Sequence, residues 1–148
     1  MKIYHVFNRG NRKEKICFDG EDLFVLKRMF LNSFVLAERV GFISLCIMPN
    51  HYHLLIAVIK KRHLSIKMRD ISRNYTTYIN KKYGLVGRLF QGPYQKKMVD
   101  SFIYFRTLVR YMEENPKELL HNRHLSRIIT NEENVKYYDF FLTTKTLP

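Results

Sequence analysis

This 148-residue sequence has few cysteines, no tryptophan and no long apolar run. It has no tryptophan and only two cysteines, Cys17 and Cys46, which excludes a disulfide framework and favours a reducing compartment. The longest apolar run, residues 54–59, is far too short to span a bilayer. The chain does not open with a charged region followed by an apolar one, so no targeting signal is visible. We therefore expect a soluble cytoplasmic protein with no membrane partner.

Acidic residues are also scarce, since 13 Asp and Glu stand against 26 Lys and Arg and the formal net charge is +13. Most of this excess lies in residues 60–98, where Asp70 is the single acid. The basic residues of this segment are Lys60, Lys61, Arg62, Lys67, Arg69, Arg73, Lys81, Lys82, Arg88, Lys96 and Lys97. Tyrosines interleave with them, and cations beside aromatic faces suit exposed bases better than a lipid surface. Nucleic acid is the first candidate partner; a solvated lysine-rich surface is the plainer alternative.

The chain does have enough apolar sequence for one folded domain. Apolar residues make up 46% of it, and its 11 Phe and 10 Tyr exclude a disordered basic tail. We predict a single domain over residues 1–148, with a core at about 3–118 and a C-terminal extension at 119–148. The apolar end of that extension, residues 137–142, is expected to dock on the body.

Hydrophobic periodicity predicts alternating strands and helices. The predicted elements are a strand at 2–7, a turn at 8–12, a helix at 23–40, strands at 42–48 and 51–59, a helix at 64–83, a strand at 94–99 and a helix from Asp100 or Ser101 to about Glu114. Pro116 disfavours helical geometry at Asn115 and so predicts the end of the last helix there. The order matches the ferredoxin-like split βαβ pattern, an α+β fold in which helices pack on an antiparallel sheet.

Two histidines lie at the beginning of the third predicted strand. Because side chains alternate across a strand, His51 and His53 project from the same face, next to a Pro-Asn turn. Two imidazoles so placed can share one divalent ion. A bare His-x-His is nevertheless a weak motif, and a lone histidine in an apolar strand is more often a core residue. The remaining histidines, expected to be structural or surface residues, are His5, His63, His121 and His124.

Five segments of the chain, taken jointly, carry a family resemblance. They are the histidine strand with its turn, the opening strand, the basic second helix, the loop after it and a Tyr-x3-Asn-Pro motif in the third helix: Met48–Ile56, Tyr4–Asn11, Ile71–Gly84, Gly87–Gly92 and Arg110–Pro116. In order and spacing they resemble the single-tyrosine HUH transposases, which include insertion-sequence transposases and REP-associated tyrosine transposases. The resemblance covers roughly residues 3–118 and implies the HUH nuclease fold.

The resemblance also implies an activity and a site. It makes Tyr111 the nucleophile that attacks a DNA phosphodiester, giving a 5′-phosphotyrosine link and a free 3′-OH. It makes His51 and His53 ligands of a divalent ion, Mg²⁺ or Mn²⁺, with the amide oxygen of Asn115 completing the set. The implied partner is single-stranded DNA with hairpin ends. A homodimer is allowed, so Tyr111 could act within its own chain or across subunits.

Physical chemistry is consistent with those roles. A phenol with a pKa near 10 is a poor nucleophile at neutral pH, and a metal ion that polarises phosphoryl oxygens eases its approach. Tyr111 and Asn115 are four residues apart and share a helix face. Two imidazoles and one amide fit Mg²⁺ or Mn²⁺ acting together with substrate phosphate oxygens. The expected DNA-binding residues are Asn8 and Arg9 near the groove, and Arg73, Lys81, Lys82 and Arg88 on the backbone of the DNA.

Two other functions remain open at this point. One is a non-catalytic or domesticated nucleic-acid-binding domain of the same fold, which would bind DNA in a salt-sensitive way without cleaving it. The other is a His-x-His metal hydrolase that acts on RNA or nucleotides, which would cleave without forming a covalent adduct.

Overall fold

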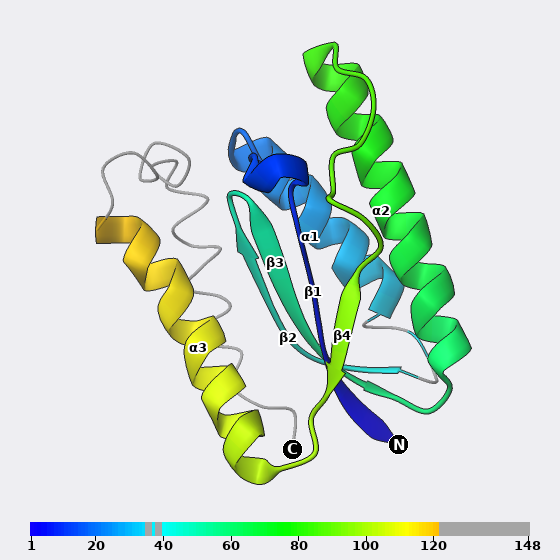
Figure 1. The fold of residues 1–148 in the computed structure, drawn as a ribbon, viewed down its shortest axis with the longest axis vertical. Helices are drawn as coiled ribbons and strands as arrows, with labels where there is room; N and C mark the ends of the chain where they lie inside the picture. Colours follow the sequence, from blue (N-terminus) through cyan, green and yellow to red (C-terminus); the bar gives the residue numbers. More distant parts are fainter. Residues whose placement is uncertain (35–36, 38–39, 122–148) are drawn as a thin grey trace.

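The computed structural model describes residues 1–34, 37 and 40–121, and residues 115–121 are described in their backbone only. The elements, shown in Figure 1, are β1 (Lys2–Arg9), the short 3-10 helix η1 (Asn11–Lys13), α1 (Gly20–Phe34), β2 (Val40–Met48), β3 (His51–Val58), α2 (Lys61–Tyr83), β4 (Gln95–Met98) and α3 (Phe102–His121).

The strands form one four-stranded sheet in the order β2-β3-β1-β4, and every neighbouring pair is antiparallel. The two central strands, β3 and β1, are joined from Lys2 opposite Val58 to Arg9 opposite His51. This is the ferredoxin-like α+β arrangement that the sequence predicts, and the prediction is confirmed.

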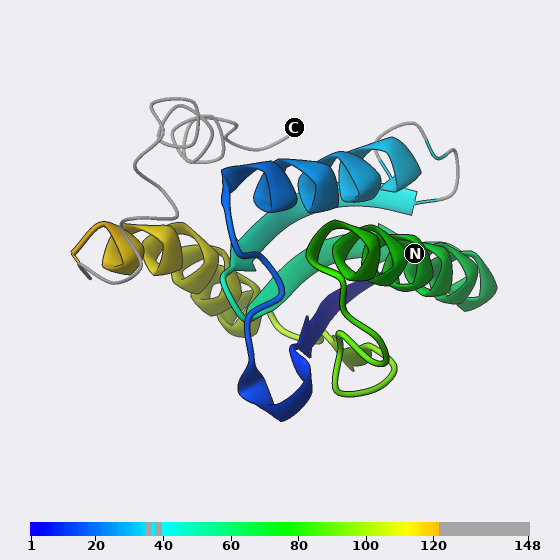
Figure 2. The ribbon, with the colours of Figure 1, turned by 90° about the horizontal axis from the view of Figure 1, so that it is seen from above.

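The two faces of the sheet are covered by different helices. On one face, Tyr52 of β3 packs against Phe30 of α1, with ring centroids 5.0 Å apart, and Phe90 lies between Tyr52 and Tyr75 of α2. On the other face, the His53 ring meets Tyr111 of α3. Figure 2 shows α1 and α2 next to each other, with α3 set apart from both. Alternate residues of β3 therefore divide between an apolar core and the α3 face.

Local sequence signals explain where the helices begin and end. Asp19 accepts a hydrogen bond from the Asp22 amide (2.9 Å) and so caps α1, while the Asp22 carboxylate accepts from the amides of Phe18 and Asp19. Gly84 ends α2 in the left-handed conformation (φ 64°), where a residue without Cβ is favoured. The hydroxyl of Ser101 accepts from the Tyr104 amide and caps α3.

Several predicted boundaries are wrong; the second predicted helix, for example, begins at Lys61 rather than at residue 64. The first helix ends at Phe34 rather than at residue 40, because Val40 is β-branched and enters β2 opposite Val58. The predicted turn at 8–12 starts too early, because Asn8 and Arg9 still belong to β1.

The last helix also runs beyond its predicted end at Asn115, to His121. Pro116 lacks one amide donor, but the residues that follow it, Lys117–Leu120, are good helix formers. The predicted docking of residues 137–142 lies outside the described residues.

Candidate active site on the α3 face of the sheet

A cavity of about 470 Å³ opens on the α3 face, where β3 begins and β1 ends. Its lining is mostly polar and comes from both central strands, η1, the Pro-Asn turn, the segment before and at β4, and α3. The lining residues are Phe7, Asn8, Arg9, Lys13, Asn50, His51, His53, Gln91, Gln95 and Tyr111.

Strand geometry brings His51 and His53 together, and α3 adds Tyr111. The two imidazole rings are 5.1 Å apart between centroids and nearly perpendicular. The Tyr111 ring lies edge-on to His53 at 5.3 Å, and its side chain is 44% exposed. Three of the four residues assigned to the chemistry thus meet at one cavity within a single chain. The fourth, Asn115, follows Tyr111 by about one helical turn in α3, and the role of its side chain remains a prediction.

In both His51 and His53, Nδ1 is the ring nitrogen that has a hydrogen-bond partner. Nδ1 of His51 lies 2.6 Å from Oδ1 of Asn50, and Nδ1 of His53 lies 2.9 Å from Nε2 of His5. Asn50 is held in turn, because its Nδ2 donates to the backbone carbonyl of Lys13 (3.4 Å). Such partners fix the orientation of an imidazole ring and leave Nε2 for another ligand.

Among the residues that the structure describes, Nε2 of His53 is the one buried side-chain nitrogen or oxygen with no hydrogen-bond partner. A buried polar atom left without a partner costs roughly 1–3 kcal/mol, so such atoms are rare and call for a partner such as water, an ion or a ligand. The orphaned atom belongs to one of the two histidines assigned to metal binding.

The site holds its histidines in the neutral form. Burial lowers the pKa of His53 to about 3, and the neighbouring imidazoles of His51 and His5 add to the effect. Burial also lowers the pKa of His51, and burial together with the Lys97 charge lowers that of His5. Neutral imidazole is the form that ligates a metal ion, so the electrostatics fit that role.

The donor set is consistent with a weakly held divalent ion but is incomplete on its own. Within the described part of the chain, no group of three or more His, Cys, Asp or Glu side chains could hold a metal ion. Two imidazoles leave most coordination positions to an amide, to water or to substrate oxygens. A closed structural zinc site would need four protein ligands.

Of the predicted DNA-binding residues, Arg9 and Asn8 line the cavity. Arg9 donates from Nε to Oε1 of Gln91 and remains exposed at the rim. Asn8 is buried, with its Nδ2 on the Gly92 carbonyl (3.0 Å) and its Oδ1 on the Arg9 amide (2.9 Å). Asn8 therefore stabilises the loop before β4, whereas Arg9 keeps its positive charge exposed at the rim of the cavity.

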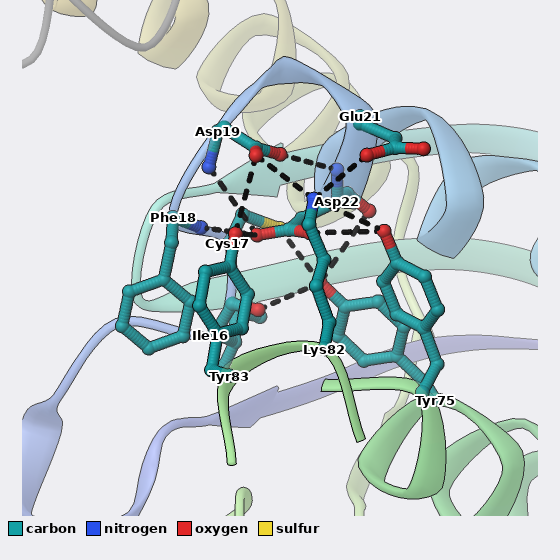
Figure 3. Close-up of polar contacts among 10 residues, drawn as sticks. Ile16, Cys17, Phe18, Asp19, Glu21, Asp22, Tyr75, Lys82 and Tyr83 are labelled. Atoms are coloured by element: carbon teal, nitrogen blue, oxygen red, sulfur yellow. Dashed lines mark hydrogen bonds and ion pairs between the residues drawn. The ribbon is translucent and has the colours of Figure 1, made fainter. Parts of the chain in front are cut away.

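The other predicted DNA-binding residues do not line the cavity. Arg73 and Lys81 are exposed on α2, which covers the opposite face of the sheet, and Arg88 is exposed in the loop after it. Lys82 is occupied by three carboxylates, those of Asp19, Glu21 and Asp22, at 2.8–2.9 Å (Figure 3). A DNA-binding role for these α2 residues stays a prediction.

Sequence reasoning missed several residues of the cavity. His5 was expected to be structural, yet it contacts His53. His5 itself does not line the cavity; the lining residues that the pattern did not single out are Phe7, Lys13, Asn50, Gln91 and Gln95. His5 could have been found, because pairing β1 with β3 puts alternate residues of both strands on one face. The loop residues carry no comparable signal.

The two cysteines are free and lie in the protein interior. Cys17 and Cys46 are buried, and burial raises the pKa of each thiol to about 12. Neither lies at the cavity. Among the described residues, no helix is long and apolar enough to cross a membrane.

Fold and site together define a class: a ferredoxin-like domain in which a pair of strand histidines faces a helix tyrosine. Residues 2–115 match the family described as "Transposase IS200 like". The chain belongs to that family, which confirms the resemblance to the single-tyrosine HUH transposases. No curated protein matches the chain significantly.

Solved structures show the same fold. A REP-associated tyrosine transposase bound to a REP hairpin aligns with a TM-score of 0.60 and 15% identity, covering 80% of this chain and 69% of the other. A protein from Deinococcus radiodurans described as a transposase aligns with a TM-score of 0.54 and 19% identity, covering 76% of this chain and 88% of the other.

Proposed function

We propose that this transposase-family protein cleaves and rejoins single-stranded DNA through a covalent tyrosine intermediate. The observation that carries the proposal is the meeting of Tyr111 with the His51–His53 pair at one cavity, with His53 Nε2 left free. A polar cavity with a nucleophile at its wall and oriented imidazoles beside it suits phosphoryl transfer.

The reaction is a transesterification. The phenolic oxygen of Tyr111 attacks the phosphorus, a new P–O bond to Tyr111 forms, and the bond to the 3′ oxygen breaks. The phenol loses its proton and the departing 3′ oxygen gains one, so the products are a 5′-phosphotyrosine and a 3′-OH. One phosphodiester replaces another, so rejoining needs no nucleotide cofactor.

A divalent ion, Mg²⁺ or Mn²⁺, would be held by His51, His53 and Asn115 and would supply charge neutralisation at the phosphoryl oxygens. The chain itself supplies orientation. His51 and His53 are fixed through Nδ1, and both line the cavity that Tyr111 also lines. Arg9 and Lys13 at the cavity offer positive charge to the phosphates on either side of the reacting one.

The partner that fits this cavity is an unpaired DNA strand, because the reacting phosphate must reach a polar pocket between the sheet and α3. The chain has a structural neighbour that is bound to a REP hairpin, which supports hairpin DNA as the form in which the strand is presented. Tyr111 meets the histidines of its own chain, which favours action within one subunit; a homodimer is not required for the site. Such a protein would act where DNA is found, in the cytoplasm of a bacterial-type cell.

A covalent-adduct assay tests the function. Labelled single strands flanked by hairpins, incubated with the protein and Mn²⁺, should give a protein–DNA adduct that is absent with Tyr111→Phe. Tyr94→Phe is the matched control, because its hydroxyl contacts Ser65 rather than the cavity, and it should keep the adduct.

Each other outcome favours a different function. An adduct that survives Tyr111→Phe refutes the nucleophile. Cleavage without an adduct, unaffected by Tyr111→Phe, favours a hydrolase. Salt-sensitive binding without cleavage in any divalent ion favours the non-catalytic alternative.

A further inference from the structure

His5 is a buried polar residue, 8% exposed, that uses both of its ring nitrogens. Its Nε2 lies 2.9 Å from Nδ1 of His53, and its Nδ1 lies 3.3 Å from the hydroxyl of Tyr104 in α3. The rings of His5 and His53 are stacked with centroids 5.1 Å apart. A chain of hydrogen bonds therefore runs from α3 through β1 to His53, which lines the cavity and whose buried Nε2 has no hydrogen-bond partner.

We propose that His5, backed by Tyr104, is a positioning residue that fixes His53 in the tautomer with its proton on Nδ1 and a lone pair on Nε2. The proposal assigns no contact between His5 and substrate. Only one consequence of the proposal rests on the proposed function, namely that the Nε2 lone pair of His53 binds a divalent ion.

The hydrogen bonds of this chain can run in only two directions. In one, Nδ1–H of His53 donates to Nε2 of His5, and Nδ1–H of His5 donates to the Tyr104 oxygen. In the other, Tyr104 donates to His5, His5 donates to His53, and the remaining proton of His53 sits on Nε2. The second direction would place an N–H at a buried atom that has no acceptor. The first leaves a lone pair there, and a lone pair, unlike an N–H, can bind a metal ion.

His51, in the same site, supports the same tautomer by a separate hydrogen bond. Its Nδ1 lies 2.6 Å from Asn50, whose Nδ2 is engaged by the Lys13 carbonyl, so the amide oxygen faces the ring and accepts from Nδ1–H. His51 is thereby held with its lone pair on Nε2. The proposed direction gives both histidines the same tautomer, so that the two lone pairs can serve one ion.

Nuclear magnetic resonance of the metal-free protein tests the tautomer directly. Two-bond ¹H–¹⁵N correlations at neutral pH distinguish protonated from bare imidazole nitrogens, and we expect Nε2 of His53 to be bare. In His5→Leu we expect both tautomers of His53, because the acceptor for Nδ1–H is gone. A wild-type protein with the proton on Nε2, or a His5→Leu protein with an unchanged single tautomer, overturns the proposal.

Metal titration with a conservative variant separates positioning from packing. Mn²⁺ binding, followed by calorimetry without DNA, should weaken about 10- to 100-fold in His5→Leu, the usual effect of removing a residue that orients a metal ligand. Tyr104→Phe should weaken it several-fold. His5→Gln offers one acceptor and a donor in place of the imidazole and should restore most of the affinity lost in His5→Leu. If His5→Gln binds as poorly as His5→Leu while the fold is intact by circular dichroism, His5 acts by packing and the proposal is wrong.

Failure of the proposed function would be distinguishable from failure of this inference. The tautomer is read without metal, DNA or turnover, so a protein that forms no adduct through Tyr111 can still show the predicted His53 state. Conversely, normal adduct formation by a protein whose His53 carries its proton on Nε2 would refute the inference and leave the function standing.

Discussion

Each face of the sheet carries a polar cluster, and the two clusters are built differently. On the α1/α2 face, the carboxylate cluster joins the beginning of α1 to the end of α2 (Figure 3). Its members are Asp19, Glu21, Asp22, Tyr78, Lys82 and Tyr83. On the α3 face, the histidine cluster consists of His5, His51 and His53.

The carboxylate cluster is closed, whereas the histidine cluster is open. Asp22 is fully buried, and its oxygens accept from Lys82, Tyr78, Tyr83 and backbone amides. The histidine cluster satisfies every Nδ1 and leaves His53 Nε2 bare. A buried network whose groups are all satisfied stabilises the fold, whereas one that leaves imidazole nitrogens without hydrogen-bond partners can accept a ligand.

The largest effect that tests this contrast is on stability. Lys82→Met should lower the free energy of unfolding by about 1.5–3 kcal/mol, because the buried Asp22 carboxylate loses its cation but keeps its tyrosine and amide donors. Urea denaturation measures it. Lys81→Met, at the exposed neighbouring position, should change stability by less than about 0.5 kcal/mol. Equal losses in the two variants would mean that the carboxylate cluster does not hold α1 to α2.

The opposite pattern is expected in the histidine cluster. If His51 and His53 hold the ion as proposed, His53→Leu should weaken Mn²⁺ binding at least about 100-fold, because it removes one of the two proposed imidazole ligands. It should change the free energy of unfolding by no more than about 1 kcal/mol, because the lost bond to His5 is offset by removal of a buried nitrogen without a partner. Calorimetry and denaturation on the same preparation give both numbers. His63→Leu, on α2, should leave Mn²⁺ binding unchanged.

The contrast also shows what sequence could and could not predict. The ferredoxin-like order followed from strand and helix periodicity, and His51 and His53 could be placed on one face because alternation is a strictly local rule. Arg73, Lys81 and Lys82 looked alike in the sequence, since each is a cation on a basic helix. Only the tertiary structure shows Lys82 paired with carboxylates some 60 residues earlier.

Loop and boundary residues were the least predictable part of the site. Lys13 lines the cavity, and both Arg12 and Lys13 adopt the left-handed backbone conformation (φ 55° and 60°). Neither arginine nor lysine favours that conformation, so the sequence does not predict it. Gly10, just before, sits where a Cβ would lie 1.9 Å from the Glu14 carbonyl oxygen, so only glycine permits this turn. The pairing of His5 with His53 needed the strand register, which periodicity alone does not supply.

The pH dependence of stability separates the clusters further. His53 has a pKa of about 3 in the folded protein, below its ordinary value of about 6.5. Between these two values the unfolded chain binds a proton that the folded chain does not, so stability falls as the pH is lowered. The slope attributable to His53 is at most about 1.4 kcal/mol per pH unit, with His51 and His5 adding in the same direction.

Denaturation of the metal-free protein between pH 6.5 and pH 4 measures that slope, and His53→Leu should flatten it. The carboxylate cluster acts at lower pH. The pKa of Asp19 is lowered because its bonds to Lys82 and to a backbone amide outweigh its burial, so its contribution is present above about pH 4 and is lost below it. A slope that is unchanged in His53→Leu would mean that His53 is not held neutral by burial.

The smallest expected effect compares two tyrosine hydroxyls, that of Tyr83 in the carboxylate cluster and that of Tyr104, which is hydrogen-bonded to the histidine cluster. Tyr83 donates to Asp22 at 2.6 Å, and Asp22 keeps its other donors when that hydroxyl is removed, so Tyr83→Phe should cost about 1 kcal/mol of stability. It should leave Mn²⁺ affinity unchanged, whereas Tyr104→Phe should lower Mn²⁺ affinity with a smaller loss of stability, because its bond to His5 is long at 3.3 Å. Each variant removes one phenolic oxygen and changes nothing else. Any difference between them in stability or in Mn²⁺ affinity therefore comes from the location of the tyrosine and not from the type of substitution. If Tyr83→Phe alters Mn²⁺ binding as much as Tyr104→Phe, the two faces are coupled and the division between a closed and an open cluster does not hold.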